Sequence, residues 1–163
     1  MSDRMTAVIE FPTFALELAS IQTAVQEEGW DEQESYPDGT TWLTVHEAAW
    51  GELPTLEDAL MNAGIAFDRR SDAKYEYDAE VRYFRPASDT TPPLDHTVST
   101  LNDHVPVISL TDLEDLGRGR RLSVRAIRAH LGLPRDTVAQ WARRHRRQFR
   151  RPIPAPKTAQ TAS

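Results

Sequence analysis

The sequence predicts an α+β fold, in which a small β-α-β-α-β-β domain is followed by a helical C-terminal module. Short apolar runs that alternate with polar residues are separated by segments whose apolar residues recur at helical spacing. The charge also reverses along the chain. Residues 1–115 hold 24 acidic and 6 basic residues, whereas residues 116–163 hold 1 acidic and 13 basic residues. Such an asymmetry indicates two modules with different partners, and a chance excess of solvated charge is the alternative.

The expected elements of the N-terminal domain follow one another in a regular order. Residues 6–11 (TAVIEF) read as a strand, because apolar side chains occupy alternate positions. A helix is expected next, capped by Thr13 and ended by Gly29. The segment 31–40 is acidic and turn-rich, with a Pro-Asp-Gly turn. The remaining expected elements are a strand over 41–46, a helix over 54–62, and strands over 65–70 and 75–85.

Two stretches of the chain are expected to lack secondary structure. Residues 87–106 combine prolines with Ser, Thr and Asp, a composition typical of a linker. This linker would join an acidic domain over 1–86 to a basic module over 107–151. Residues 152–163 (PIPAPKTAQTAS) have nothing to bury, which predicts a disordered tail.

The residue types present exclude or disfavour several classes of site. The chain has no cysteine, which excludes disulfides, thiolate zinc sites and cysteine nucleophiles. It has no glycine-rich phosphate loop, nucleophile elbow or metal-ligand cluster, so we expect a non-enzymatic protein without a metal or cofactor. No stretch is long and apolar enough to span a membrane and the N-terminus lacks a signal-peptide pattern, so we expect a cytoplasmic protein.

Two weaker possibilities for chemistry stay open at this point. His46 and Glu47 lie beside two tryptophans and could take a metal-binding or catalytic role, although no second histidine follows at helical ligand spacing. A predicted hairpin also carries carboxylates that could pair for acid–base chemistry, if a pocket raised the pKa of one of them. These carboxylates belong to Asp72, Glu76, Asp78 and Glu80.

The most informative segment covers residues 122–151, which read as two helices joined by a tight turn. Ser123 can cap the first helix, and Gly132 ends it in the left-handed conformation. Pro134 presets the backbone for the second helix. The apolar residues expected to meet between the helices are Val124, Ile127 and Leu131 on the first and Val138 and Trp141 on the second.

A further helix is expected ahead of this pair, over residues 108–117. Thr111 and Glu114 would form its capping box, and its leucines can pack inward. The helix is short, and a flexible basic connection follows it at residues 117–120. The helical module is therefore expected to be marginally stable alone, which favours dimerisation or docking on the N-terminal domain.

Residues 123–147 resemble the helix-turn-helix family, especially its resolvase, transposase and small-repressor versions. The resemblance rests on the turn sequence LGLPRDTV with its glycine and on the apolar set Ile127, Leu131, Leu133, Val138 and Trp141. One position departs from the family pattern, because Arg128 stands where a small residue is usual. The alternative is an ordinary helical hairpin with a solvated basic face. The resemblance implies that the chain binds double-stranded DNA, with its second helix in the major groove.

By this resemblance and by helical geometry, the second helix presents two sets of residues to DNA. Arg135 is expected to read guanine, Gln140 adenine, and Ala139 a thymine methyl group. The full base-contacting set is Arg135, Asp136, Ala139, Gln140 and Arg143. The phosphate-contacting set, which positions the protein without specifying sequence, is Thr137, Arg144, Arg146, Arg147, Arg150 and Arg151.

These features predict a sequence-specific, double-stranded DNA-binding protein: a transcriptional regulator of a phage or other mobile element, acting as a homodimer on a palindromic site. The main alternative is an anti-defence inhibitor, whose acidic domain would bind a nucleic-acid-processing complex as a mimic of nucleic acid. Anti-CRISPR and anti-restriction proteins are similar in layout. A third possibility is an accessory protein for recombination or DNA transfer. The acidic surface also has a simpler explanation, namely solubility or neutralisation of the basic arm.

Overall fold

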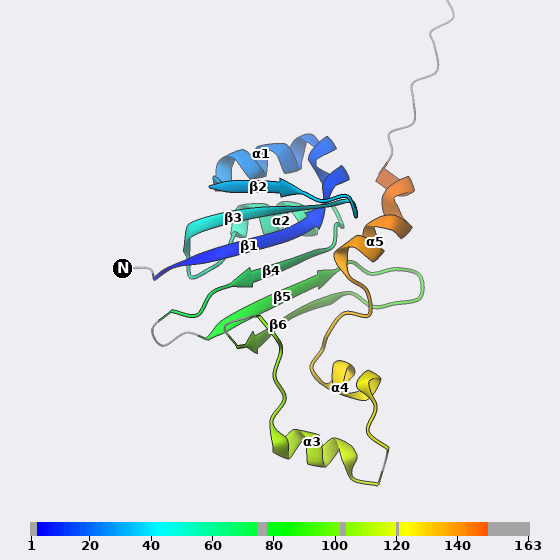
Figure 1. Ribbon diagram of the computed structural model, residues 1–163. Helices are drawn as coiled ribbons and strands as arrows, with labels where there is room; N and C mark the ends of the chain where they lie inside the picture. Colours follow the sequence, from blue (N-terminus) through cyan, green and yellow to red (C-terminus); the bar gives the residue numbers. More distant parts are fainter. Residues whose placement is uncertain (1–2, 75–77, 102–103, 120, 150–163) are drawn as a thin grey trace, which may run out of the picture.

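The computed structural model describes residues 3–74, 78–101, 104–119 and 121–149, which fold around one antiparallel sheet (Figure 1). The strands of this sheet lie in the order β2-β3-β1-β4-β5-β6. Their bounds are Arg4–Pro12 (β1), Glu32–Ser35 (β2), Thr40–Ala49 (β3), Phe67–Ser71 (β4), Ala79–Arg85 (β5) and Leu94–Thr100 (β6). Every neighbouring pair is antiparallel. Together with the helices, this sheet confirms the predicted α+β class.

The helices divide into two groups in space. Helices α1 and α2 pack against one face of the sheet and against each other, whereas α3, α4 and α5 belong to the C-terminal part (Figure 1). The α-helices span Ala19–Glu28 (α1), Pro54–Asn62 (α2), Leu110–Gly117 (α3), Val124–His130 (α4) and Val138–His145 (α5). Two 3-10 turns span Thr13–Glu17 (η1) and Arg146–Phe149 (η2).

The main apolar core lies between the sheet and the two N-terminal helices. Along β1, the alternate residues Ala7, Ile9 and Phe11 are fully buried and belong to this core. Helix α2 contributes Leu56 and Leu60 from successive turns. Burying a side chain of this size contributes about 1.5–3 kcal/mol, so the alternation along β1 decides which face of the sheet the helices cover.

A buried ion-pair network joins α2 to β4 and β5. Glu57 on α2 is only 1% exposed, and its two carboxylate oxygens lie 2.9 Å from Nε of Arg69 and 2.5 Å from Nη1 of Arg82. Arg69 also pairs with Glu80 at 2.7 Å, and Arg82 with Asp95 at 2.8 Å. Because an unpaired buried charge is costly, each member of the network depends on its partners.

The N-terminal part contains more strands than the sequence predicted. The segment expected to be turn-rich forms β2 and a hairpin with β3, with the Pro-Asp-Gly turn at the expected place between them. Within the expected linker 87–106, the proline-free stretch Leu94–Thr100 forms β6 and pairs with β5 along its whole length. The linker prediction was wrong there, since backbone pairing to an existing sheet edge does not require strong apolar alternation. The order of elements is therefore β-α-β-β-α-β-β-β.

The predicted helix ends were partly right. Ser123 caps α4 by accepting a hydrogen bond from the amide three residues on, and Gly132 takes a φ of +65° as expected. Helix α3 is capped by Ser109 and not by Thr111, because the helix begins two residues earlier than the capping box required. Thr13 opens the 3-10 turn η1 and does not cap α1.

Helix α5 does not pack as a helix-turn-helix pair with α4 would require. We call the six-stranded sheet together with η1, α1 and α2 the sheet domain. Trp141 belongs to the apolar core of this domain, whereas Ile127 and Leu131 do not. Val124 is 75% exposed, and neither α3 nor α4 contains a buried residue. Figure 1 shows α5 beside the end of β1, apart from α4. The expected packing of Trp141 was wrong, because a seven-residue α4 offers less apolar surface than the sheet domain. Docking on the N-terminal domain is the arrangement that the structure adopts.

Candidate nucleic-acid interface

The apolar face of α5 is held against the sheet domain by an aromatic cluster. Trp141, which is 5% exposed, stacks on Phe14 of η1 with ring centroids 6.4 Å apart. Phe149 of η2 stacks on Phe14 at 5.0 Å, and His145 stacks on Trp141 at 4.5 Å. Ala142 lies in the same core. Aromatic pairs of this kind contribute about 0.5–1.5 kcal/mol each beyond the area that they bury, so the cluster fixes the rotation of α5 about its axis.

The first turn of α5 is fixed by polar contacts. Thr137 and Gln140 form a capping box, in which each side chain accepts a hydrogen bond from the other residue's amide, at 3.2 and 3.1 Å. Arg85 of β5 donates to the backbone carbonyl of Asp136 at 2.9 Å. The carboxylate of Asp136 also pairs with Arg144 near the C-terminal end of α5. The N-terminus of α5 is therefore tied both to itself and to the sheet.

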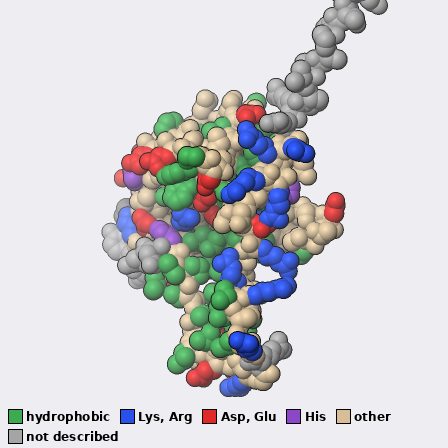
Figure 2. Space-filling view, turned by 45° about the vertical axis from the view of Figure 1, so that its right-hand side comes forward, with side chains coloured by type: hydrophobic (Ala, Val, Ile, Leu, Met, Phe, Trp, Pro, Cys, Tyr) green, Lys and Arg blue, Asp and Glu red, His purple; other side chains and the backbone are tan. Residues whose placement is uncertain are grey.

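The opposite face of α5 is exposed and basic. The exposed residues are Gln140, Arg143 and Arg144 of α5 and Arg147 of the η2 turn that follows it, spaced at i, i+3, i+4 and i+7. This spacing places them on one side of the helix. Figure 2 shows Lys and Arg side chains gathered in a band that runs from the region of α5 down toward α4. We call these four residues the basic stripe of α5.

The predicted base-contacting residues are not equally well placed. Arg135, Gln140 and Arg143 are exposed, although the side-chain carbonyl of Gln140 is engaged in the helix cap. Asp136 is half-buried and takes part in an ion pair. Ala139 is only 6% exposed, so the prediction that it touches a thymine methyl group was wrong. In the orientation in which α5 packs on the sheet domain, Ala139 faces the interior of the protein.

The predicted phosphate-contacting residues are exposed where the structure describes them. Thr137, Arg144, Arg146 and Arg147 all face solvent in or beside α5 and η2. The oxygen of the Thr137 hydroxyl also accepts the capping hydrogen bond. Arg150 and Arg151 lie outside the described residues.

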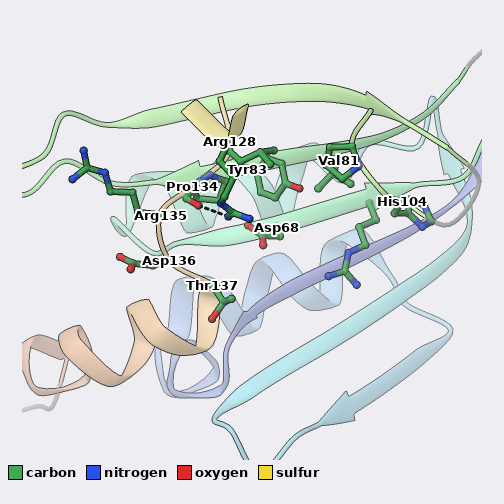
Figure 3. Close-up of a pocket in the computed structure, with 12 residues that line it drawn as sticks. Asp68, Val81, Tyr83, His104, Arg128, Pro134, Arg135, Asp136 and Thr137 are labelled. Carbon is green, nitrogen blue, oxygen red and sulfur yellow. Dashed lines mark hydrogen bonds between the residues drawn. The ribbon is translucent and has the colours of Figure 1, made fainter. Parts of the chain in front are cut away.

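A pocket of about 480 Å³ lies between the sheet and the connector between α4 and α5, residues 131–137 (Figure 3). Its sheet wall comes from the face of β4 and β5 opposite α1 and α2. The lining residues are Asp68, Arg70, Val81, Tyr83, His104, Pro106, Arg128, Leu133, Pro134, Arg135, Asp136 and Thr137. No sequence pattern marks Asp68, Arg70 or Tyr83 as part of a site, because only the folded sheet brings these strand residues under the connector.

Most charges on this face of the sheet are paired. Nη1 of Arg85 lies 2.7 Å from the Asp68 carboxylate, and Nη2 of Arg70 lies 3.4 Å from that of Glu10. Burial raises the pKa of Asp68 above its usual value. Burial, together with the nearby charge of Asp68, also raises the pKa of Glu10. Burial likewise raises the pKa of Tyr83, which keeps its hydroxyl protonated at neutral pH.

The structure lends little support to the weaker chemical possibilities. In the described part of the chain, no group of three or more His, Cys, Asp or Glu side chains could hold a metal ion. His46 and Glu47 are both exposed, and His46 lies 3.6 Å from Glu32. Of the four carboxylates considered for acid–base chemistry, Glu76 lies outside the described residues and Glu80 pairs with an arginine.

A membrane-spanning helix is also missing from the described ranges, whose helices are all too short or too polar to cross a bilayer. Comparisons with known proteins identify no relative: the chain matches no family model, no curated protein and no solved structure. The likeness of residues 123–147 to helix-turn-helix proteins therefore stays a prediction.

Proposed function

We propose that this chain binds double-stranded DNA through the basic stripe of α5 and acts as a sequence-specific regulator. The observation that carries the proposal is a row of exposed, mostly cationic side chains on a helix whose opposite face is fixed in the sheet domain. In helix-turn-helix proteins a partner helix supports the DNA-binding helix. Here the sheet domain takes that supporting role, through Trp141 and Phe14.

The dimensions and chemistry of α5 suit a duplex groove. The diameter of an α-helix with its side chains, about 10–12 Å, matches the width of the major groove of B-DNA, about 12 Å. Arg143 and Arg147 can each form paired hydrogen bonds with a phosphate or with a guanine edge. Arg135, exposed beside the start of the helix, extends the cationic surface. Phosphate contacts of this kind supply affinity, and contacts to base edges supply specificity.

The acidic excess of the N-terminal region does not by itself favour the anti-defence alternative. Several of its carboxylates are engaged by arginines of the same sheet domain. These carboxylates belong to Glu10, Glu57, Asp68, Glu80 and Asp95. Part of the negative charge therefore stabilises the fold instead of forming a surface that imitates nucleic acid.

Fluorescence anisotropy of a labelled DNA duplex, titrated with the full chain, tests the proposal. The double substitution Arg143→Gln with Arg147→Gln removes two cations from the basic stripe and leaves the buried face of α5 unchanged. We expect the affinity to fall about tenfold or more. The slope of log K against log salt should also become shallower, by about 0.9 for each of the two arginines that contacts a phosphate.

The matched control is Arg4→Gln with Arg118→Gln, which removes two exposed cations outside α5. We expect its affinity to stay within about twofold of the unmodified protein, since neither residue lies on the stripe. Equal losses in the two double variants, or no saturable binding by the unmodified chain, would refute the proposal. Selection of bound sequences from a random duplex pool then tests specificity, and a repeated half-site would identify a homodimeric regulator.

A further inference from the structure

We propose that the pocket between the sheet and the α4–α5 connector binds a small organic anion that carries a planar apolar ring. None of the four residues of the basic stripe lines the pocket, so binding of a ligand there can be measured without DNA. Its volume of about 480 Å³ falls within the range of about 300–1,000 Å³ that is typical of small-molecule sites. Its two walls come from parts of the chain that are distant in sequence.

The charge balance of the pocket favours a negatively charged ligand. On the sheet wall, Asp68 is neutralised by its ion pair with Arg85, and Arg70 by its ion pair with Glu10. The guanidinium of Arg70 also lies over the ring of Trp42, 4.6 Å from the centroid, which holds it against the sheet. These pairs leave the sheet wall close to neutral, so the residues on the connector side determine the sign of the net charge of the pocket.

Arg128 supplies the positive charge that these pairs do not cancel. This α4 residue donates a hydrogen bond from Nη2 to the carbonyl of Pro134 at 2.9 Å and forms no ion pair with a described carboxylate. Figure 3 shows Arg128, Tyr83 and Asp68 converging on the middle of the pocket, whereas the side chain of Arg135 extends away from it. A carboxylate here would meet the guanidinium of Arg128 and the hydroxyl of Tyr83, both of which can donate hydrogen bonds to it. It would also lie near the Asp68 carboxylate, whose charge is offset by its ion pair with Arg85.

The apolar part of the lining favours a flat ring. Val81 and the ring of Tyr83 come from neighbouring positions on one face of β5, because alternate strand residues share a face. Leu133 and Pro134 come from the connector on the other side, and Pro134 is itself buried. An aromatic ring between these two walls would bury apolar surface on both of its faces. It would also link the connector, and hence the start of α5, to the sheet.

Calorimetric titration of the full chain with benzoate and benzamide tests the inference. The two probes share a ring and a planar head group, and they differ in charge. We expect benzoate to bind saturably and benzamide to bind at least about tenfold more weakly, because the amide cannot form the charge-assisted hydrogen bond to Arg128. Arg128→Gln should weaken benzoate about tenfold and leave benzamide nearly unchanged. Tyr83→Phe, which removes only the hydroxyl, should weaken benzoate by a smaller factor.

Arg125→Gln is the matched control, since Arg125 is an exposed arginine of the same helix that does not line the pocket. We expect it to leave benzoate affinity unchanged. Equal affinity for benzoate and benzamide would overturn the anion assignment. Unchanged benzoate affinity in Arg128→Gln, or no saturable benzoate binding, would overturn the site itself. Because no DNA is present in these titrations, their outcome is independent of the DNA-binding proposal.

Discussion

Trp141 stacks on Phe14, so the last described α-helix packs on the 3-10 turn that follows the first strand. This contact joins residues from opposite ends of the described chain. It makes α5 part of the core of the sheet domain and not a separate module. It also sets which face of α5 is buried and which face carries exposed arginines, and the proposed function rests on that division.

Trp141→Ala should destabilise the whole protein, because it removes the centre of the aromatic cluster and leaves a cavity. We expect a loss of about 3–5 kcal/mol in the free energy of unfolding, measured by urea denaturation of the full chain. Val124→Ala is the matched control, since Val124 is 75% exposed on α4 and should matter by no more than about 0.5 kcal/mol. Equal small losses for the two substitutions would contradict the burial of Trp141 against the sheet domain.

Glu57→Gln should be costly, because it leaves two partly or fully buried guanidinium groups without their shared carboxylate. Removing one partner of a buried ion pair typically costs about 3–5 kcal/mol. Glu47→Gln removes a carboxylate whose partner Arg4 is largely exposed, and it should cost less than about 1 kcal/mol. Urea denaturation of both variants checks the difference. Equal small losses would mean that α2 is held to the sheet by its leucines alone.

Gly132→Ala should destabilise the connector more than its backbone conformation alone explains. Gly132 and Gly64 both have a φ of +65°, so alanine at either position costs about 1–2 kcal/mol. An added Cβ at Gly132 would also lie 2.4 Å from Cδ2 of His96 on β6, whereas nothing lies within 4 Å of one at Gly64. We expect Gly132→Ala to cost more than Gly64→Ala in thermal unfolding.

The same contact predicts a specific rescue. His96→Ala should remove most of the extra cost of Gly132→Ala, because it takes away the ring that the new methyl group would strike. A double-mutant cycle measures this coupling directly. Additive effects of the two substitutions would show that the connector does not lie against β6.

Stability should depend on pH through Glu10. Burial and the charge of Asp68 raise the pKa of Glu10 in the folded state, so the folded protein holds this proton more tightly than the unfolded chain. As the pH rises above 4.5, the ordinary value for this carboxyl, the contribution of Glu10 to stability therefore falls. Glu10→Gln removes this penalty. Urea denaturation at several pH values should show that the free energy of unfolding of the variant increases relative to that of the unmodified protein as the pH rises. A relative decrease would contradict the sign of the pKa shift.

Local signals in the sequence predicted local structure well. The helix expected over 54–62 matches α2 at both ends, and the cap at Ser123 and the left-handed Gly132 are where they were expected. Each depends on a few neighbouring residues, which a sequence pattern records. The edge strands β2 and β6 were missed, because their few apolar side chains give almost no alternation and they pair by backbone hydrogen bonds.

Tertiary partners could not be predicted in the same way. The apolar spacing of α5 shows that Trp141 is buried, but it does not show against what. Trp141 could have packed against α4 or against the sheet domain. The rings that surround it could not be identified from the pattern of α5, because Phe14 is far away in sequence and Phe149 follows the last turn of the helix. The pocket was unpredictable for the same reason, because Tyr83 and Arg128 are far apart in sequence and line one pocket only in the folded protein.

An NMR titration of the full chain with duplex DNA tests most directly whether α5 binds DNA in its docked position. We expect the largest amide shifts at Gln140, Arg143 and Arg147, while the indole signal of Trp141 stays unchanged because the aromatic cluster remains closed. Shifts concentrated on other elements would contradict the assigned surface. A Trp141 signal that moves to its solvent-exposed position as DNA binds would show that α5 must leave the sheet domain first.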